Sequence, residues 1–397
     1  MYLRLFAIIM GEVFMSHKIT TKSGFNLGGV LNTINKNGTF AGFLSDDKIS
    51  NIEEFIDTGS YALNAIIGGS VHYGIPRGRV VGLVGPQGCG KSLLCCNIVK
   101  DAQDKGYTVY YIDTENAITD VMISNMGGDP DTVVKINDNI IESVQTNAAN
   151  ILKATIDFNK DVDKWNEENP SEEPKAYEKC LIIIDSLGNL MTEKELQNSL
   201  SGDVASDMGL RAKQLGSMLR VITNLSAQAK SPVVFSNHIY SNPGQMYPSI
   251  IQNQSGGMKP LYVSSVIVQL SQTLTKISDD KNSEHSSISQ KTTGRNLRAL
   301  TTKNRFVVSE LETNLKLNYR TGLDRYSGLL DLAVAVGFIK RAGSTYLLGE
   351  DKLGYASSFD KPEFWDQHLN ELDKLITSET ALSKKPPEIP ENPTKSE

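Results

Sequence analysis

The chain of 397 residues lacks any apolar run that approaches the ~20 residues needed to span a membrane, so we predict no transmembrane helix. Cysteine is scarce, and its four copies form neither a CxxC pair nor a disulfide framework, which indicates free thiols and a cytoplasmic protein. The apolar start, residues 1–15, is short, is interrupted by Glu12 and has no small-residue cleavage site. It does not have the pattern of a signal peptide, and Met15 is a second candidate for the first residue.

A surplus of positive charge is missing too. The formal net charge is −6, which argues against a protein that coats nucleic acid through bulk charge. Acidic residues, however, are absent locally: residues 208–278 contain none, although average composition would place about eight there, and residues 291–309 contain none either. Such exclusion of carboxylates suits a phosphate-rich partner, while the alternative is a set of buried strands and polar loops that need no charge. The basic residues of the two segments are Arg211, Lys213, Arg220, Lys230, Lys259, Lys276, Lys291, Arg295, Arg298, Lys303 and Arg305.

Apolar runs that are typical of buried strands alternate with helical patterns along the chain. This alternation predicts an α/β fold with a mostly parallel sheet that helices cover on both faces. Residues 91–104 have helical spacing, and the charged, proline-broken residues 160–177 are predicted to form a surface loop. The predicted strands are residues 80–84, 108–112, 180–184, 233–235 and 263–270.

Three parts are predicted along the chain. Residues 1–50 are rich in Gly, Asn and Ser and form an N-terminal appendage, residues 51–348 form the main domain, and residues 349–397 form a C-terminal extension. The end of the chain, from Ser383, has four prolines and few large apolar side chains, which predicts a disordered tail.

A phosphate-binding pattern follows the first predicted strand. It matches GxxxxGK[ST] and lies between a strand and a helix, which is the context that this motif requires. Its glycines let backbone N–H groups point at phosphates, Lys91 is predicted to bridge the β- and γ-phosphates of ATP, and Ser92 is predicted to bind Mg²⁺. The matching residues are Gly85, Pro86, Gln87, Gly88, Cys89, Gly90, Lys91 and Ser92.

Carboxylates follow two other predicted strands. Asp185 comes directly after an apolar run, so its side chain is predicted to lie beside the phosphate loop and to bind Mg²⁺ directly or through water. Glu115 follows the strand at residues 108–112 and is the predicted general base that deprotonates the attacking water. Asp113 is an alternative for the catalytic role, and a simple turn or helix-start residue is the alternative reading of each position.

A set of blocks in fixed order resembles the RecA family of recombinases, and most closely its phage branch, the UvsX-type recombinases of T4-like phages. The resemblance runs from about Ile52 to Leu348 and implies a RecA-type core. The first 50 residues match poorly, although the family would have a polymerisation element there. The blocks are SYALNAIIGGSVHYGIPRG (60–78), the phosphate loop, YIDTENAITDVMISNMGGDP (111–130), IIIDSLGNL (182–190), DMGLRAKQLGSMLR (207–220), FSNHI (235–239), Gly256-Gly257, Lys303-Asn304-Arg305 and YSGLLDLAVAVGFI (326–339).

The resemblance implies the same roles for the two carboxylates and adds further site residues. His238 matches a position that senses the γ-phosphate. Lys303 and Arg305 match a basic pair that reaches the γ-phosphate held by a neighbouring subunit, and Tyr319 matches an aromatic residue that contacts adenine across the same interface. The alternatives are a structural core histidine and a solvated basic turn.

The family also implies two DNA-binding loops inside the acid-free segment, at residues 202–209 and 239–257. The second is rich in Ser, Asn, Gln, Gly and Pro and contains Met246. This composition suits a segment that orders on single-stranded DNA and inserts a stacking side chain. The residues implied to contact DNA are Met208, Lys213, Arg220, Tyr247, Gly256 and Gly257.

Together these patterns predict a DNA-dependent ATPase that uses ATP and Mg²⁺, forms a helical filament on single-stranded DNA and exchanges strands with homologous duplex DNA. Single-strand-binding and mediator proteins are the further partners expected, in the host cytoplasm if a phage encodes the chain. The rivals are a hexameric helicase with the same core and a nucleotide-driven ATPase without a DNA role.

Overall fold

The computed structural model describes residues 25–35, 52–202, 208–240, 253–254, 259–277 and 294–382. Contacts within the chain divide it into two units, Met1–Asn51 and Ile52–Glu397. In the first unit, the described residues include helix α2 (Leu27–Asn35), and the Asn26 side chain accepts a hydrogen bond from the Gly29 N–H at 2.9 Å. The second unit contains the central sheet and every described residue of the predicted site.

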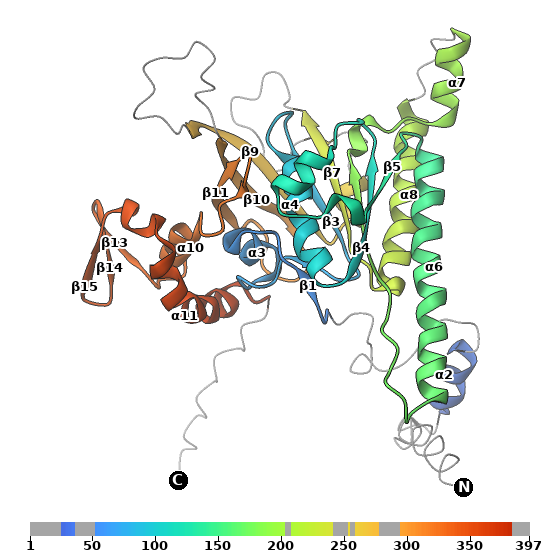
Figure 1. Ribbon diagram of the computed structural model, residues 1–397, viewed down its shortest axis with the longest axis horizontal. Helices are drawn as coiled ribbons and strands as arrows, with labels where there is room; N and C mark the ends of the chain where they lie inside the picture. The colour runs from blue at the N-terminus through green and yellow to red at the C-terminus, as the bar shows by residue number, and fades with distance from the viewer. Residues whose placement is uncertain are drawn as a thin grey trace, which may run out of the picture. The chain divides into compact units, whose positions relative to one another are not determined.

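The central sheet of the second unit has parallel and antiparallel parts. In the described residues its strands are β3 (Val80–Gly85), β4 (Tyr107–Asp113), β5 (Val133–Asn137), β6 (Lys179–Asp185), β7 (Val233–Tyr240), β8 (Asn253–Gln254), β9 (Val266–Ile277), β10 (Gly294–Asn304), β11 (Glu312–Asn318) and β12 (Gly322–Leu323). Their order is β12-β11-β10-β9-β3-β7-β6-β4-β5, with β8 paired to β7 (Figure 1). Neighbours run parallel from β9 to β5 and antiparallel from β9 to β12, which confirms the predicted α/β fold.

Helices cover both faces of this sheet, which is why its central strands are apolar throughout. The helices of the core are α3 (Tyr61–Gly68), α4 (Lys91–Asp104), α5 (Asp120–Asn125), α6 (Ile141–Glu168), α7 (Glu193–Ser201), α8 (Met208–Ala229) and α9 (Lys259–Val263). Alternate side chains of β3 enter different buried clusters, Val81 and Leu83 on one face and Val80 and Val84 on the other. Helices α3 and α4 complete the first cluster, and α6 and α8 lie side by side over the second (Figure 1).

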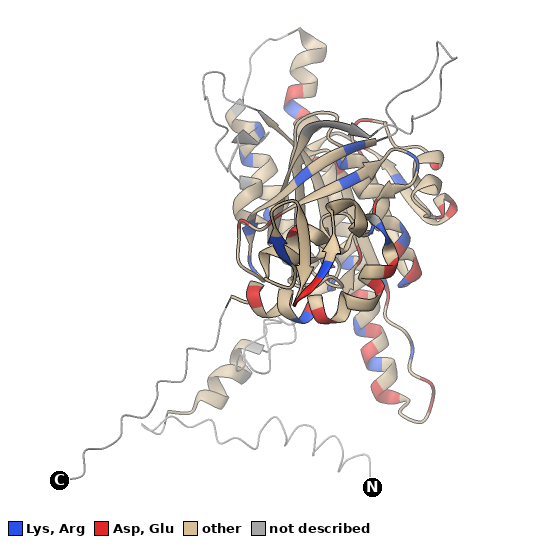
Figure 2. Cartoon of the chain, turned by 90° about the vertical axis from the view of Figure 1, so that its left-hand side faces the viewer, with Lys and Arg blue, Asp and Glu red and all other residues tan. Residues whose placement is uncertain are grey.

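Helix α6 corrects the sequence prediction of a loop at residues 160–177. The helix continues to Glu168 and ends just before Pro170, which cannot extend it. Beyond Thr155, only Val162 is a buried residue of this helix, and Lys164 and Glu168 form an (i, i+4) pair. Because this end of the helix buries so little, it has no apolar period, and acidic and basic residues are interspersed along it (Figure 2).

The predicted strand at residues 263–270 was also partly wrong. Its first residue closes α9, in which Pro260 occupies the first turn, and the Ser264 hydroxyl donates to the Pro260 carbonyl at 2.7 Å. Strand β9 begins only at Val266. Five described strands of the central sheet were not predicted, namely β5, β8, β10, β11 and β12. Polar residues interrupt the apolar runs of the longer three, β5, β10 and β11.

The C-terminal elements pack into the same core. They are α10 (Leu329–Ala335), β13 (Lys340–Ala342), β14 (Thr345–Leu348), β15 (Asp351–Gly354), η4 (Ala356–Asp360) and α11 (Pro362–Thr380). Trp365 and Leu372 of α11 are buried in the cluster that contains α3 and α4, and the Asp373 carboxylate accepts the Val71 N–H at 2.7 Å. The predicted disordered tail, from Ser383, lies outside the described residues.

Smaller features complete the described chain. A two-stranded sheet pairs β1 (Phe55–Ile56) with β2 (Ile75–Pro76), and short 3-10 turns form η2 (Pro130–Thr132) and η3 (Leu187–Asn189). Among the described helices, none combines the length and the apolar character that crossing a bilayer requires.

Candidate nucleotide and DNA site

The predicted phosphate-binding loop joins β3 to α4 at the carboxyl edge of the sheet. Gly88 and Gly90 have φ angles of +72° and +86°, a region that favours glycine. At Gly85, a Cβ would lie 2.7 Å from the Cys89 sulfur and 2.8 Å from a backbone oxygen, so a larger residue does not fit. Residues 86–88 form the exposed tip of the loop. The glycines therefore leave open the space and the backbone conformations that a phosphate cradle needs.

Lys91 is the first residue of α4, and its side chain is buried. Its Nζ donates to the carbonyl of Gly85 at 3.1 Å and to that of Pro86 at 2.9 Å. The same Nζ lies 3.5 Å from Nδ1 of His238. The ammonium group is thus held inside the loop, against the histidine that the resemblance singled out.

Glu115 and His238 come together at the same edge. Nε2 of His238 lies 3.4 Å from Oε1 of Glu115, so this ring lies between Lys91 and the predicted base. The parallel register of β3 and β7, which pairs Gly85 with His238, brings the histidine level with the start of the phosphate loop.

Asp185 ends β6 and is buried. Its carboxylate accepts hydrogen bonds from the hydroxyl of Tyr111, at 2.8 Å, and from that of Ser236. Ser92, the other predicted magnesium ligand, lies in the first turn of α4. In the part of the chain that the structure describes, no three or more His, Cys, Asp and Glu residues group as metal ligands. Ser92 and Asp185 fit Mg²⁺ because this ion is usually bound by one or two carboxylates together with phosphate oxygens.

Ser186 is a site residue that the sequence reasoning missed. Its hydroxyl donates to Oε1 of Glu115 at 2.7 Å, the oxygen that also faces His238. Its backbone N–H and carbonyl both bond to the Thr114 hydroxyl, at 2.8 and 2.9 Å. The only signal in the sequence was its position after Asp185, and the contact depends on the alignment of β4 with β6.

Asp113, the alternative base, has a structural role in this fold. Its carboxylate accepts the backbone N–H groups of Ala117 and Ile118 at 3.2 and 3.0 Å and pairs with Lys135 at 3.0 Å. Burial opposes the charge of Asp113, but the bonds from Ile118 and Lys135 outweigh it and lower its pKa. A carboxylate held in this way is a poor proton acceptor, which favours Glu115 as the base.

We expect Asp113→Asn to lower the stability of the fold by about 1–3 kcal/mol, because Lys135 loses its ion-pair partner and keeps only the Ile118 carbonyl, while the folded fraction still hydrolyses ATP. Glu115→Gln should do the reverse and lose hydrolysis with an unchanged melting temperature. Thermal unfolding and ATPase rates of both variants are the measurements. An Asp113→Asn protein of normal stability without activity would reverse the assignment.

Lys303 and Arg305 lie at one end of the strands of the sheet, and the phosphate loop of their own chain lies at the opposite end. Strand β10 ends at Asn304, which pairs with Val266 of β9, and this residue pairs with Val81 near the start of β3. The loop follows the other end of β3, about 13 Å further along the strand. The pair is therefore remote from the nucleotide that its own loop would hold.

The basic pair caps α9. Nζ of Lys303 donates to the carbonyls of Leu261 and Tyr262, both at 2.7 Å, and Nη2 of Arg305 donates to that of Tyr262 at 3.3 Å. Burial, followed by the positive charge of Arg305, lowers the pKa of Lys303 to about 8. The interpretation of a solvated basic turn therefore does not describe Lys303, whose head group is bound to the protein.

Tyr319 lies beyond β11, at the edge that carries the phosphate loop of its own chain. Its hydroxyl accepts a hydrogen bond from Nε of Arg295 at 2.6 Å, and Arg295 also donates to the Gln272 side chain. Gln272 in turn donates to the Gln87 carbonyl of the loop at 3.4 Å. These contacts connect Tyr319 to the loop of its own chain. We therefore expect Tyr319 to contact the adenine that its own subunit binds, whereas the resemblance implied an adenine across an interface.

The predicted DNA-binding residues are described only in part. Lys213 and Arg220 have exposed side chains on α8 and, seven residues apart, lie on one side of it. Met208 begins α8, but its side chain lies outside the described residues. So do Tyr247, Gly256, Gly257 and most of both implied loops.

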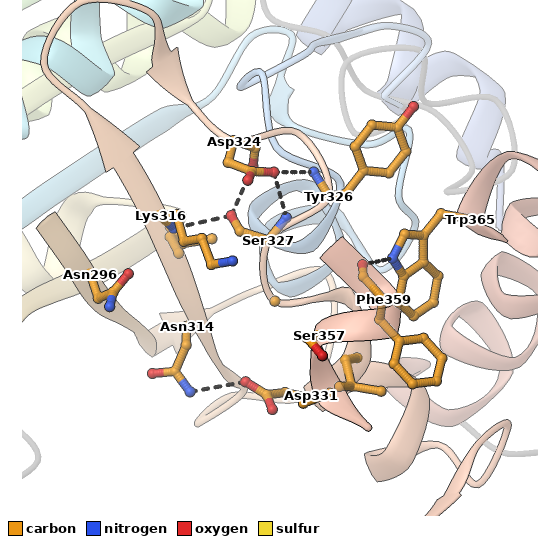
Figure 3. A pocket seen from close by; sticks show the side chains of 14 residues that line it. Asn296, Asn314, Lys316, Asp324, Tyr326, Ser327, Asp331, Ser357, Phe359 and Trp365 are labelled. Atoms are coloured by element: carbon orange, nitrogen blue, oxygen red, sulfur yellow. Dashed lines mark hydrogen bonds between the residues drawn. The ribbon is translucent and has the colours of Figure 1, made fainter. Parts of the chain in front are cut away.

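A cavity of about 510 Å³ lies apart from these residues (Figure 3). Polar side chains of β10 and β11, among them Asn296, Asn314 and Lys316, line one side, and Phe359 and Trp365 line the other. None of the predicted site residues lines it, so it is distinct from the nucleotide site.

The fold and the site define an α/β protein in which a phosphate-loop lysine, a histidine and a glutamate meet at the carboxyl edge of a parallel sheet. Residues 29–158 match the family model described as the RecA N-terminal domain. Three relatives carry the name Protein RecA, from Streptomyces rimosus (27% identical over 347 residues, 86% of this chain and 81% of the relative), Streptomyces coelicolor (28% over 353 residues, 87% and 83%) and Acholeplasma laidlawii (28% over 338 residues, 83% and 89%). These comparisons support the RecA family for this chain. They do not support the narrower UvsX-type branch, because the relatives bear bacterial RecA names.

Proposed function

We propose that this protein is an ATP-dependent DNA strand-exchange recombinase that assembles as a filament on single-stranded DNA. The observation that carries the proposal is the His238 ring between Lys91 and Glu115, with contacts of 3.5 and 3.4 Å. The ring connects Lys91, which would face the γ-phosphate, with Glu115, whose carboxylate can activate water. The RecA name of the relatives supports the DNA function.

Each residue at this edge then has a defined task. The backbone of the loop Gly85–Ser92 holds the phosphates of ATP, and Lys91 neutralises the charge that develops during phosphoryl transfer. Ser92 and Asp185 hold Mg²⁺, which supplies further neutralisation of phosphate charge when bound. Glu115 accepts the proton of the attacking water, and His238 senses the γ-phosphate. Tyr319 is a contact for adenine of its own subunit.

Assembly of subunits follows from the basic pair. Lys303 and Arg305 lie at the end of β10, about 13 Å along the sheet from the level of their own phosphate loop. They can act on a γ-phosphate only if a neighbour presents it, in a head-to-tail contact that repeats along a filament. Lys303 and Arg305 would then exchange the carbonyls of α9 for the phosphate oxygens of the neighbour's ATP. A ring-forming helicase with the same core would use the same geometry.

The DNA surface includes the exposed side of α8. Lys213 and Arg220 lie in a segment without acidic residues, and no described residue pairs with either side chain. Backbone phosphates and base faces would be the contacts, so the binding is largely independent of sequence, and base pairing provides recognition of homology.

Lys213→Ala or Arg220→Ala should weaken binding to every single-stranded sequence and flatten the salt dependence by roughly 0.7 per lost phosphate contact. Fluorescence anisotropy over a series of salt concentrations measures both effects. Lys164→Ala, which removes an exposed lysine from the projecting end of α6, is the matched control. Unchanged salt slopes for both α8 variants would mean that these residues do not bind phosphate.

The narrower hypothesis of the phage branch depends on one residue. His238 stands at a position that is usually Gln in the bacterial members of the RecA family. A histidine at this position is similar to what the UvsX-type sequences have. This assignment, like the host cytoplasm as location and the mediator proteins as partners, is part of the proposal.

Strand exchange between a circular single strand and a linear homologous duplex tests the function. With ATP and Mg²⁺, nicked circular product should form, and electron micrographs should show filaments. Closed rings that unwind a forked duplex without exchanging strands would favour the helicase. ATP hydrolysis without any DNA stimulation would favour an ATPase that has no DNA role.

A further inference from the structure

Arg211 joins the helix of the proposed DNA surface to the segment that follows the catalytic carboxylates. It lies in the first turn of α8, and its side chain is partly buried. Nε donates to the Leu190 carbonyl at 2.7 Å, and Nη2 donates to those of Gly188 and Leu187 at 2.9 and 3.3 Å. One guanidinium group thus binds three carbonyl oxygens in and just after η3, and the Leu187 carbonyl also accepts the Leu190 N–H at 3.4 Å.

The other side of η3 contacts the predicted base and sensor. Ser186, directly before η3, donates its hydroxyl to Oε1 of Glu115 at 2.7 Å. Gly188 lies so close to His238 that a Cβ on it would be 2.8 Å from the ring carbon Cδ2. A small displacement of η3 would therefore change the position of both Glu115 and His238.

Helix α8 has two functional sides at its first turns. Arg211 and Lys213 are two residues apart, so their side chains leave the helix about 200° from each other. Arg211 faces η3, whereas Lys213 is exposed on the side proposed to bind DNA. Leu215 and Met218 of the same helix are fully buried, which makes α8 a firm element between the two.

We propose that Arg211 is a positioning residue that couples DNA binding on α8 to Glu115 and His238 through η3. The proposal rests on the function proposed above. It follows a continuous line of hydrogen bonds and packing contacts from α8 to the base. Arginine suits the task because its planar fork can bond several fixed carbonyls at once, which a lysine ammonium on a flexible stem does not reproduce.

The test compares Arg211→Ala and Arg211→Lys with the unchanged protein. ATP turnover is measured without DNA and at saturating single-stranded DNA, and the Kd for an oligonucleotide is measured with and without a non-hydrolysable ATP analogue. For Arg211→Ala we expect DNA-stimulated kcat to fall by about 5- to 150-fold towards the DNA-free rate, the range of ordinary coupling between sites. Because η3 would also link the two binding equilibria, the analogue should lose its tightening effect on DNA, and by reciprocity DNA should lose its tightening effect on the analogue. Arg211→Lys should be intermediate.

Two variants on the same helix are controls. Lys213→Ala should mainly weaken the Kd for DNA, whereas the loss of DNA-stimulated kcat at saturating DNA is the effect expected of Arg211→Ala. Gln228→Ala, at the far end of α8, where the side chain bonds only within the helix, should change neither quantity. Melting temperatures test whether each variant is folded. If Arg211→Ala does not fold, the comparison is made with Arg211→Lys.

Full DNA stimulation of kcat in a folded Arg211 variant would overturn the proposal. An equal loss of kcat with and without DNA would overturn it too, because that result describes a residue that only holds the active site together. If the unchanged protein shows no DNA stimulation, it is the proposed function that fails, and this outcome is visible before any variant is made.

Discussion

Lys91→Ala should reduce ATP turnover by at least about 100-fold, the scale observed when one preorganised donor is removed from a reacting centre. The fold should survive, because Nζ of Lys91 bonds only to the carbonyls of Gly85 and Pro86 and to neighbouring site groups, and the loop tip is open to water. Steady-state hydrolysis and thermal unfolding give the two measurements.

Lys100→Ala is the control for this experiment. Lys100 lies on the same helix, is more than half exposed and pairs with Asp104 one turn away. An exposed pair of this kind contributes little to stability, so both activity and melting temperature should stay normal. Near-normal hydrolysis by Lys91→Ala would remove the basis for assigning the nucleotide site to this loop.

A mixture of two inactive variants should recover activity if the catalytic centre straddles a head-to-tail interface. Glu115→Gln loses the base, so its rate of ATP hydrolysis should fall by roughly 10²- to 10⁴-fold, the usual contribution of general-base catalysis. Lys303→Ala/Arg305→Ala loses the pair that would act in trans, with a loss of about 10³ to 10⁵ if it works as an arginine finger does. In a random equal mixture, about a quarter of the interfaces would join an intact base to an intact pair.

The structure gives the physical reason for this expectation. The end of β10 is level with the start of β3, and Nζ of Lys303 caps α9 on that side, so no subunit can bring both halves to its own ATP. Hydrolysis by the co-assembled mixture on single-stranded DNA should therefore reach about a quarter of the unmutated rate.

The matched control mixes Glu115→Gln with Lys91→Ala. Both changes damage the half of the centre that holds ATP, so every interface in this mixture keeps one defect and the rate should stay low. Recovery in both mixtures, or in neither when co-assembly has been verified, would mean that the basic pair does not act across an interface.

Local pattern predicted the strand and the helix around the candidate phosphate loop well. The helical spacing of residues 91–104 matches α4, and the run that ends at Gly85 is β3, because strand and helix periods are set by neighbours in the chain. The same reasoning failed at residues 160–168. That end of α6 buries little, so it lacks the apolar period that marks a helix, although it is one.

The acid-free segments show where composition stops being informative. Lys230, inside the first segment, pairs with Glu53 at 3.1 Å, and Arg298, inside the second, pairs with Glu312. Arg211 is bound to carbonyls. Carboxylates from other parts of the chain thus pair with basic residues of the two acid-free segments. Only some of the basic residues in these segments therefore remain available to bind a polyanion.

The sequence by itself determined the loop Gly85–Ser92, the α/β order of elements and the presence of two carboxylates after neighbouring strands, because each depends on residues close together in the chain. Only the tertiary structure decided which groups contact each of the carboxylates Asp113 and Glu115. Lys135 comes from β5 to hold Asp113, whereas Ser186 and His238 come from other segments to face Glu115. Strand register likewise puts Lys303 at the far edge of the sheet. These are contacts between distant parts of the chain, and their geometry exists only once the strands have paired.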